Sequence, residues 1–115
     1  MEENKQIELV AMQIILHAGN ARDNVTKALG LISDHNYEEA DQELNIAQEE
    51  MRLAHKAQTD IVQEEARGIS YGYSVLFAHA QDTLMTIYSE LNIAKQLYTM
   101  FKKLDEMISK IENEK

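Results

Sequence analysis

Histidine and carboxylate side chains are the groups through which this sequence could perform chemistry. The chain contains four histidines, no cysteine and twenty acidic residues, which excludes a thiolate nucleophile and a thiolate metal site. No histidine follows a glutamate by three positions, and no two histidines are four positions apart. Di-iron helical bundles and zinc hydrolases require those spacings. The sequence also lacks a glycine-rich phosphate-binding loop. Any chemistry must therefore use imidazole or oxygen.

His79 is the histidine whose surroundings best suit a chemical role. Alanines flank it, Asp82 follows one helical turn later on the same face, and Gln81 is a neutral hydrogen-bonding neighbour. Small flanking residues leave an imidazole open to a large partner. The alternative interpretation is a histidine at the edge of the core that is hydrogen-bonded to Asp82. The other histidines are more simply interpreted as solvated side chains without a role: His17, His35 and His55.

Three helices are expected to position these residues. Proline is absent and glycine occurs four times, so the chain lacks the turn residues that sheets and barrels need. Apolar residues spaced by three and four predict helices over about residues 7–33, 36–66 and 73–111. Asn36, with Glu39 three positions later, has the pattern of a helix-capping pair. The sequence therefore predicts an all-α, antiparallel three-helix bundle with a long third helix.

The third predicted helix carries two sets of apolar residues. The first set begins at Tyr73, includes Leu84 and Leu91, and is wide enough to pack on the first two helices. The second set repeats in steps of four and three, as in a coiled-coil seam. A lone three-helix domain would expose this seam to water, so we interpret it as a self-association surface. The alternative is one wide stripe on the most buried helix. The seam consists of Ile93, Leu97, Met100, Leu104, Met107 and Ile111.

Composition limits the class of protein and of partner. The length of 115 residues, with 44% hydrophobic and 27% charged residues, is typical of a single ordinary domain spanning residues 1–115. The formal charge of −9 would repel nucleic acid and anionic lipid surfaces. No apolar run approaches the roughly eighteen residues of a spanning helix, and the first residues do not resemble a signal peptide. We therefore expect a cytoplasmic protein without direct membrane insertion.

Four segments carry a resemblance to one known family. The segment HAQDTLMT at residues 79–86 closely resembles the active-site motif of the IIA components of the bacterial sugar phosphotransferase system, lactose/cellobiose class, which includes N,N′-diacetylchitobiose members. Residues 18–22 (AGNAR), 37–40 (YEEA) and 54–59 (AHKAQT) look like other signatures of that family, in the same order. The resemblance covers about residues 7–105, which is nearly the whole chain.

The resemblance implies a homotrimer of three-helix subunits, a nine-helix bundle, that carries a phosphoryl group. By resemblance, His79 is phosphorylated by the histidine-containing phosphocarrier protein and passes the group to a cysteine of the cognate IIB protein. The implied process is uptake of a β-linked disaccharide of the lactose, cellobiose or chitobiose type, without direct sugar binding. Gln81 would lie beside the acceptor in a supporting role.

The resemblance also implies a metal ion. Asp82 looks like the aspartate that gathers near the threefold axis and holds one divalent cation per trimer, commonly Mg²⁺. Three converging carboxylates would repel one another unless a proton or a cation neutralised them, which gives the metal a physical reason.

One residue departs from the family pattern, and one other interpretation remains open. The family usually has a second histidine directly after the aspartate, where this chain has Thr83. This chain therefore lacks the second imidazole that could support the reaction, whereas the acceptor itself, His79, is present. The other interpretation is a non-catalytic helical interaction module, since residues 36–47 also resemble part of a tetratricopeptide helix pair. That architecture needs repeats of about 34 residues, and the sequence contains no second copy.

Overall fold

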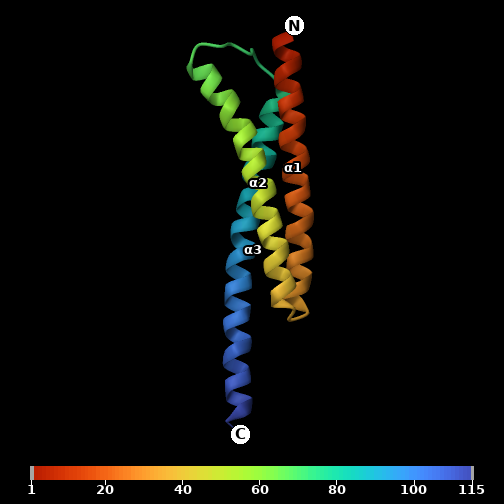
Figure 1. Cartoon of the computed structure of the whole chain (residues 1–115), viewed down its shortest axis with the longest axis vertical. Coiled ribbons are helices and arrows are strands. Elements are labelled where there is room, and N and C mark those ends of the chain that lie inside the picture. The colour runs from red at the N-terminus through yellow and green to blue at the C-terminus, as the bar shows by residue number, and fades with distance from the viewer. Residues whose placement is uncertain (1, 115) are drawn as a thin grey trace.

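The computed structural model describes residues 2–114, with side chains from residue 5 onwards, and it consists of three helices (Figure 1). They are α1 (Glu2–Ser33), α2 (Tyr37–Ala66) and α3 (Val75–Asn113). α2 runs antiparallel to α1, and α3 returns parallel to α1 and extends past the turn that joins α1 to α2. Within the described residues there is no strand. The predicted all-α bundle with a long third helix is confirmed.

Small side chains dominate the core where the helices pack. Alanine is the commonest buried residue, and its size lets helix backbones approach closely. Larger aliphatic and thioether groups, such as Ile14, Met51 and Leu84, fill the space between the alanine contacts. The apolar residues that recur by three and four in α2 are buried over most of the helix, and the acidic residues between them are mainly exposed. The amphipathic pattern of the sequence thus identifies the core faces of α1 and α2.

The turn between α1 and α2 is closed by hydrogen bonds at both helix ends. The N–H of Asn36 donates to the carbonyl of Leu31 at 2.8 Å, and the N–H of His35 donates to that of Ile32 at 3.0 Å. This is the Schellman arrangement, and His35 takes the left-handed position, with φ of 61°, where glycine is usual. The Asn36 side chain then accepts from the N–H of Glu39, which confirms the predicted capping pair.

The start of α3 differs from the prediction. Tyr73, expected in the core arc, lies before the helix and is 83% exposed. The reason is that Ser74 has an extended backbone and its hydroxyl accepts from the N–H of Phe77 at 3.1 Å, so Ser74 caps a helix that begins at Val75.

Two other aromatic residues take the place expected for Tyr73. Phe77 is 7% exposed and Tyr71 is 4% exposed, and both belong to the hydrophobic core. The Tyr71 hydroxyl donates to Glu64 near the end of α2, which ties the α2–α3 connection to the bundle. The backbone turns at Gly68 and Gly72, which both have positive φ.

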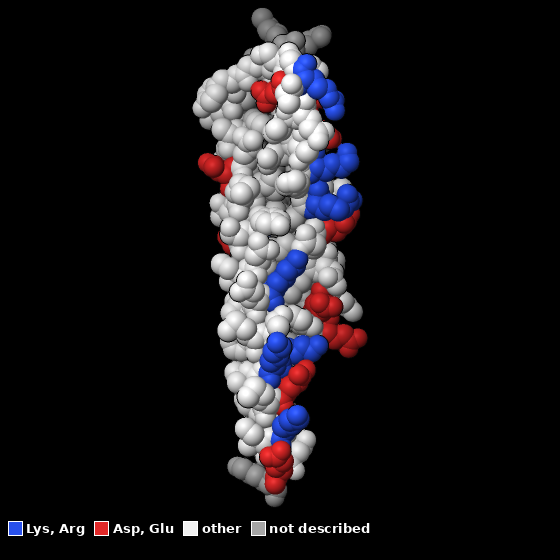
Figure 2. Space-filling model, turned by 90° about the vertical axis from the view of Figure 1, so that its left-hand side faces the viewer, with Lys and Arg blue, Asp and Glu red and all other residues white. Residues whose placement is uncertain are grey.

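The predicted seam of α3 is exposed. Leu97 is half-buried and the other five seam residues are exposed, so the alternative of one wide buried stripe is wrong. At about 100° per residue, the seam lies roughly 150° around the helix from the buried stripe of α3. Figure 2 shows that the upper and middle parts of this view are mostly free of charged side chains away from the edges, whereas the narrow lower part carries charges of both signs.

The last turns of α3 lie beyond the other two helices (Figure 1). The Tyr37 hydroxyl, at the α1–α2 turn, donates to the carbonyl of Phe101 at 3.2 Å and also to the carboxylate of Asp105. From Asp105 to Asn113 the helix continues for about 12 Å. Leu104, just before this overhang, and Met107, Ile108 and Ile111 within it are exposed apolar residues. No described helix has an apolar segment long enough to cross a membrane.

Candidate functional site

The first two turns of α3 hold His79 in place. Ser74 caps the helix, and Phe77 and Ala80 on either side of His79 are buried in the core. Their burial fixes the rotation of α3, so His79 points away from the core and is exposed. The Thr83 hydroxyl donates to the backbone carbonyl of His79 at 2.9 Å. Thr83, the position of the family's usual second histidine, therefore contacts the His79 backbone.

The imidazole of His79 has no polar side-chain partner among the residues whose side chains are described. Across residues 5–114, no carboxylate lies within 4 Å of its ring nitrogens and no side chain is hydrogen-bonded to them. Asp82 is exposed and makes no such contact to His79. The structure therefore lacks the hydrogen bond that a core-edge histidine held by Asp82 requires. A free, exposed imidazole can act as a nucleophile toward an incoming group.

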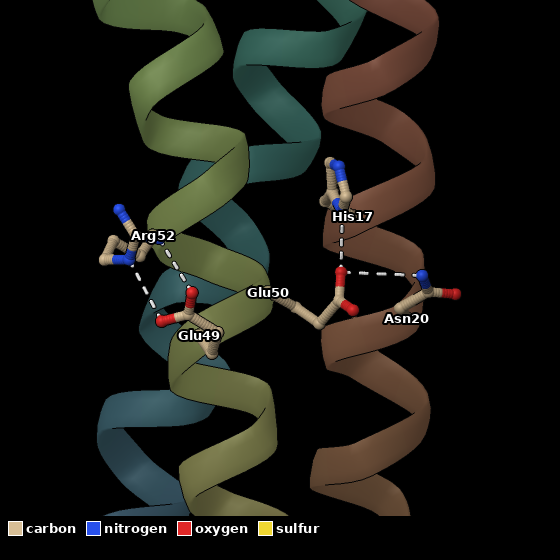
Figure 3. A network of polar contacts seen from close by, with 5 residues as sticks. All are labelled: His17, Asn20, Glu49, Glu50 and Arg52. Carbon is tan, nitrogen blue, oxygen red and sulfur yellow. Dashed lines mark hydrogen bonds and ion pairs between the residues drawn. The ribbon is translucent and has the colours of Figure 1, made fainter.

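His17 instead has a structural partner. Its Nδ1 lies 2.6 Å from a carboxylate oxygen of Glu50, and the Asn20 amide donates to the same oxygen at 3.5 Å (Figure 3). These contacts join α1 to α2 at a half-buried position. On the other side of α2, Arg52 donates twice to Glu49 within one helical turn. His17 is thus not the solvated side chain that the sequence suggested.

The two remaining histidines also lie beside polar groups. Nδ1 of His35 lies 2.6 Å from the carboxylate of Asp105, across the end of the bundle. Nδ1 of His55 lies 3.5 Å from the Thr59 hydroxyl, one turn along α2. Of the four histidines, His79 is the one whose ring has no polar partner among the described side chains.

Asp82 lies on the exposed apolar face of α3. It precedes Ile93 by eleven residues, which is about three helical turns, so both project from nearly the same side. Gln81 is half-buried and lies two positions after His79. The apolar seam and Asp82 therefore share one face, with the carboxylate at the end nearer His79.

Among its described residues, a single chain does not bring together the ligands of a metal site. Within the described part of the chain, no group of three or more histidine or acidic side chains is placed to hold an ion. The carboxylate of Asp82 has the oxygen chemistry that Mg²⁺ prefers, but a single carboxylate is too few ligands for a protein-held cation. A divalent cation at Asp82 would need further carboxylates from other copies of the chain.

The register of α1 against α3 places His79 beside α1. Arg22 donates to both carboxylate oxygens of Glu90, at 3.0 and 3.2 Å. His79 precedes Glu90 by eleven residues, and Ala11 precedes Arg22 by the same number. Because the helices are parallel, His79 lies level with Ala11 and on the side of α3 that faces α1. Apolar periodicity describes one helix at a time, so it could not predict this register. The register is seen from a contact between two helices.

The grooves of the bundle are shallow and open. One of them, of about 400 Å³, lies between α2 and α3 and is lined by Met51, His55, Leu84 and Met85, among others. His79 does not line it. His79 is exposed outside this groove.

Comparison with known proteins places this helical chain among the phosphotransferase components of sugar uptake. Residues 9–102 match the family described as PTS system, lactose/cellobiose-specific IIA subunit. The chain belongs to this family, whose members take part in phosphoryl transfer during sugar uptake.

Individual relatives support the same assignment. The chain is 35% identical over 103 residues to the lichenan-specific phosphotransferase enzyme IIA component of Bacillus subtilis, covering 90% of this chain and 94% of the relative. It is 35% identical to the lactose-specific EIIA component of Staphylococcus epidermidis, covering 85% and 94%. The crystal structure of the cellobiose-specific enzyme IIA from Bacillus anthracis superposes with a TM-score of 0.82 at 37% identity, covering 87% and 92%.

Proposed function

We propose that this protein is a phosphocarrier whose acceptor is His79. It takes a phosphoryl group from the histidine-containing phosphocarrier protein and passes it to a cysteine of the cognate IIB protein. The observation that carries the proposal is the exposed His79 imidazole, free of polar side-chain partners among the described residues, within a segment that resembles the family's active-site motif. The other three histidines each lie beside a polar side chain.

The first transfer exchanges one phosphorus–nitrogen bond for another. A ring nitrogen of neutral His79 attacks the phosphorus on the donor's phosphohistidine, and the bond from phosphorus to the donor imidazole breaks. His79 releases the proton from its other ring nitrogen, and the leaving imidazole takes up one proton. The scaffold contributes positioning and the exclusion of water rather than further covalent chemistry.

The second transfer returns His79 to its starting state. The thiolate of the acceptor cysteine attacks the phosphorus, so a phosphorus–sulfur bond forms while the bond to His79 breaks. The released imidazole regains a proton. Gln81 has a supporting role in our proposal, because it lies half-buried two positions after the acceptor and its amide can donate hydrogen bonds.

The proposed working form is a homotrimer joined through α3. The exposed seam of α3 supports this arrangement, because each Leu or Ile side chain buried there would stabilise the assembly by about 1.5 to 3 kcal/mol. The same face carries Asp82, so copies that meet along the seam would bring their Asp82 carboxylates together. Those carboxylates would hold one Mg²⁺, which neutralises their repulsion when bound.

The proposed partners are proteins, and the sugar does not touch this chain. The family membership supports transport of a β-linked disaccharide, and relatives with lactose, cellobiose and lichenan specificity are all similar to this sequence. The net charge of −9 argues against nucleic acid as a partner. We place the transfer in the cytoplasm, where the phosphoryl donor of this system acts.

A reconstituted relay tests the proposal. Purified protein is mixed with phosphoenolpyruvate, the general phosphotransferase proteins and a IIB protein of this class. We expect label to appear first on this chain as phosphate that is stable in base and labile in acid, and then on the IIB cysteine. Label that reaches IIB equally fast when this chain is omitted would contradict the proposal.

A further inference from the structure

The last part of α3 has little contact with the rest of the subunit. Ala94 is the last buried residue of the helix, and from residue 99 to residue 114 Asp105 is the one residue that is not exposed. We refer to residues 99–113 as the C-terminal segment of α3. A helix of about fifteen residues without a packed face is only marginally stable in water. In a single subunit, the order of this segment therefore depends on its contacts with the α1–α2 turn (Figure 1).

His35, on that turn, has a backbone conformation that is unfavourable for a residue with a side chain. Its φ is 61°, and among the described residues it is the one non-glycine residue with a positive φ. Glycine is usual at this position of a helix end because it has no Cβ. A histidine here needs a compensating contact, and its Nδ1 lies 2.6 Å from the carboxylate of Asp105, seventy positions along the chain. The turn thus holds an imidazole against the C-terminal segment of α3.

Asp105 receives a second contact from the start of α2. The Tyr37 hydroxyl donates to its carboxylate and to the carbonyl of Phe101. The Tyr37 ring also packs edge-on against Tyr98, with ring centroids 6.1 Å apart, and the amine of Lys102 lies 5.6 Å from the centroid of Tyr98. These contacts bring the turn and the C-terminal segment together at one place.

The charged groups around His35 leave Asp105 as its partner. Among the described side chains, Asp105 supplies the one carboxylate within 4 Å of the His35 ring nitrogens. Along the chain, His35 is preceded by Asp34 and followed in the first turn of α2 by two acidic residues, Glu38 and Glu39. The groove beside Tyr37 and Asp105 is lined by further charged residues of α3: Lys102, Glu106 and Lys110.

We propose that His35 and Asp105 form a pH-sensitive latch, which holds the C-terminal segment of α3 on the bundle when His35 is protonated. Histidine side chains ordinarily change charge between about pH 5 and 8. A protonated ring makes a charge-assisted hydrogen bond to a carboxylate, and this bond is stronger than the one a neutral ring makes. The latch therefore closes on acidification and loosens as the pH rises through this range.

The other two groups of the contact keep their charge over the same range. The hydrogen bond from Tyr37 and the contact with His35 lower the pKa of Asp105, so the carboxylate stays ionised. The same hydrogen bond raises the pKa of Tyr37 to about 12, so the phenol stays protonated. Of the three groups, His35 is thus the one whose charge changes near neutral pH.

The latch acts on the part of α3 that carries most of the exposed seam. It lies about 39 Å along α3 from His79, so it does not depend on the proposed function. A closed latch keeps the exposed apolar side chains of the C-terminal segment in helical order on one face. The seam residues in this segment are Met100, Leu104, Met107 and Ile111.

Amide hydrogen exchange of the full chain tests the latch. Exchange of residues 99–108 is measured at about pH 5.5 and about pH 8, on either side of the histidine range, and is corrected for intrinsic rates. His35→Asn removes the titrating ring but keeps a residue that tolerates the left-handed backbone. Asp105→Asn removes the carboxylate. His55→Asn, at an exposed histidine of α2, is the matched control. All proteins are compared at a concentration where sedimentation gives them the same mass.

At about pH 5.5 we expect these amides to exchange about two- to fivefold more slowly in wild type than in His35→Asn, which is the range for an exposed ion pair. The ratio should approach one at about pH 8. The corrected exchange in Asp105→Asn should not depend on pH, and His55→Asn should match wild type. An equal ratio at both pH values would overturn the latch, because His35 would then act through the backbone alone. A pH effect that persists in Asp105→Asn would overturn it as well.

Discussion

At the scale of single residues, the end of the bundle is organised around Asp105. Its carboxylate accepts from the Tyr37 hydroxyl and lies beside the His35 ring, and these two contacts lower the pKa of Asp105, with the Tyr37 hydrogen bond the larger cause. The same hydrogen bond raises the pKa of Tyr37 to about 12. Both shifts favour the folded state at neutral pH, when the carboxylate is charged and the phenol is protonated.

The shift of Tyr37 predicts an alkaline loss of stability. A raised pKa in the folded state means that the contribution is complete below the ordinary tyrosine value near 10 and disappears as the pH rises to about 12. Tyr37→Phe should therefore be less stable than wild type at pH 8, and the difference should shrink as the pH rises through that window. Urea unfolding at several pH values measures this. Tyr88→Phe, at an exposed tyrosine, is the control, and a constant gap between wild type and Tyr37→Phe would refute the assignment.

At the scale of the helices, the cap of α3 sets the position of His79. Ser74→Ala removes the acceptor for the N–H of Phe77. Loss of such a cap costs about 1 kcal/mol of unfolding free energy. We expect Ser74→Ala to unfold at lower urea concentration and its first α3 amides to exchange faster with solvent. Ser74→Asp should restore the cap. Unaltered exchange in the alanine variant would show that the hydroxyl does not hold this end of the helix.

Local patterns allowed most of the helical architecture to be predicted from the sequence. The three helices, the Asn36 cap and the exposed seam all follow from residue spacing, which depends on near neighbours along the chain. The prediction placed Tyr73 inside the third helix, whereas α3 begins at Val75. Apolar periodicity contains no information about the Ser74 side chain that caps the helix there. The contacts of His17 and His35 were not predicted, since each joins residues far apart in the sequence. The local sequence around His79 identified it as the candidate acceptor. Its position beside α1 became known only from the contact between Arg22 and Glu90 in the structure.

At the scale of the whole molecule, the seam predicts the oligomeric state. In sedimentation at micromolar concentration we expect the mass of three chains. Replacement of Leu104 by Asp should yield a monomer that remains helical, because Leu104 is exposed in the single subunit and three buried charges would repel one another. Circular dichroism checks the helix content. A wild-type monomer at micromolar concentration would contradict the trimer.

Replacement of Asp82 tests the proposed metal site, which is also a property of the whole assembly. If the carboxylates of several copies hold a divalent cation, a chelator should lower the melting temperature of wild type but not of Asp82→Asn, in which the repulsion is gone. Phosphorylation of His79 should continue in that variant. A general-base role predicts instead an unchanged assembly and phosphorylation slowed by about 10²- to 10⁴-fold. Slow labelling of an intact, chelator-sensitive Asp82→Asn oligomer would contradict the structural role.

The most direct measurement of the central claim is phosphate incorporation into single histidine variants. Each variant is incubated with phosphoenolpyruvate and the general phosphotransferase proteins, and the phosphate that is stable in base and labile in acid is counted. We predict that His79→Ala abolishes incorporation. His17→Ala, His35→Ala and His55→Ala should incorporate one phosphate per chain, as in wild type. Full labelling of His79→Ala would show that another residue is the acceptor and would contradict the account.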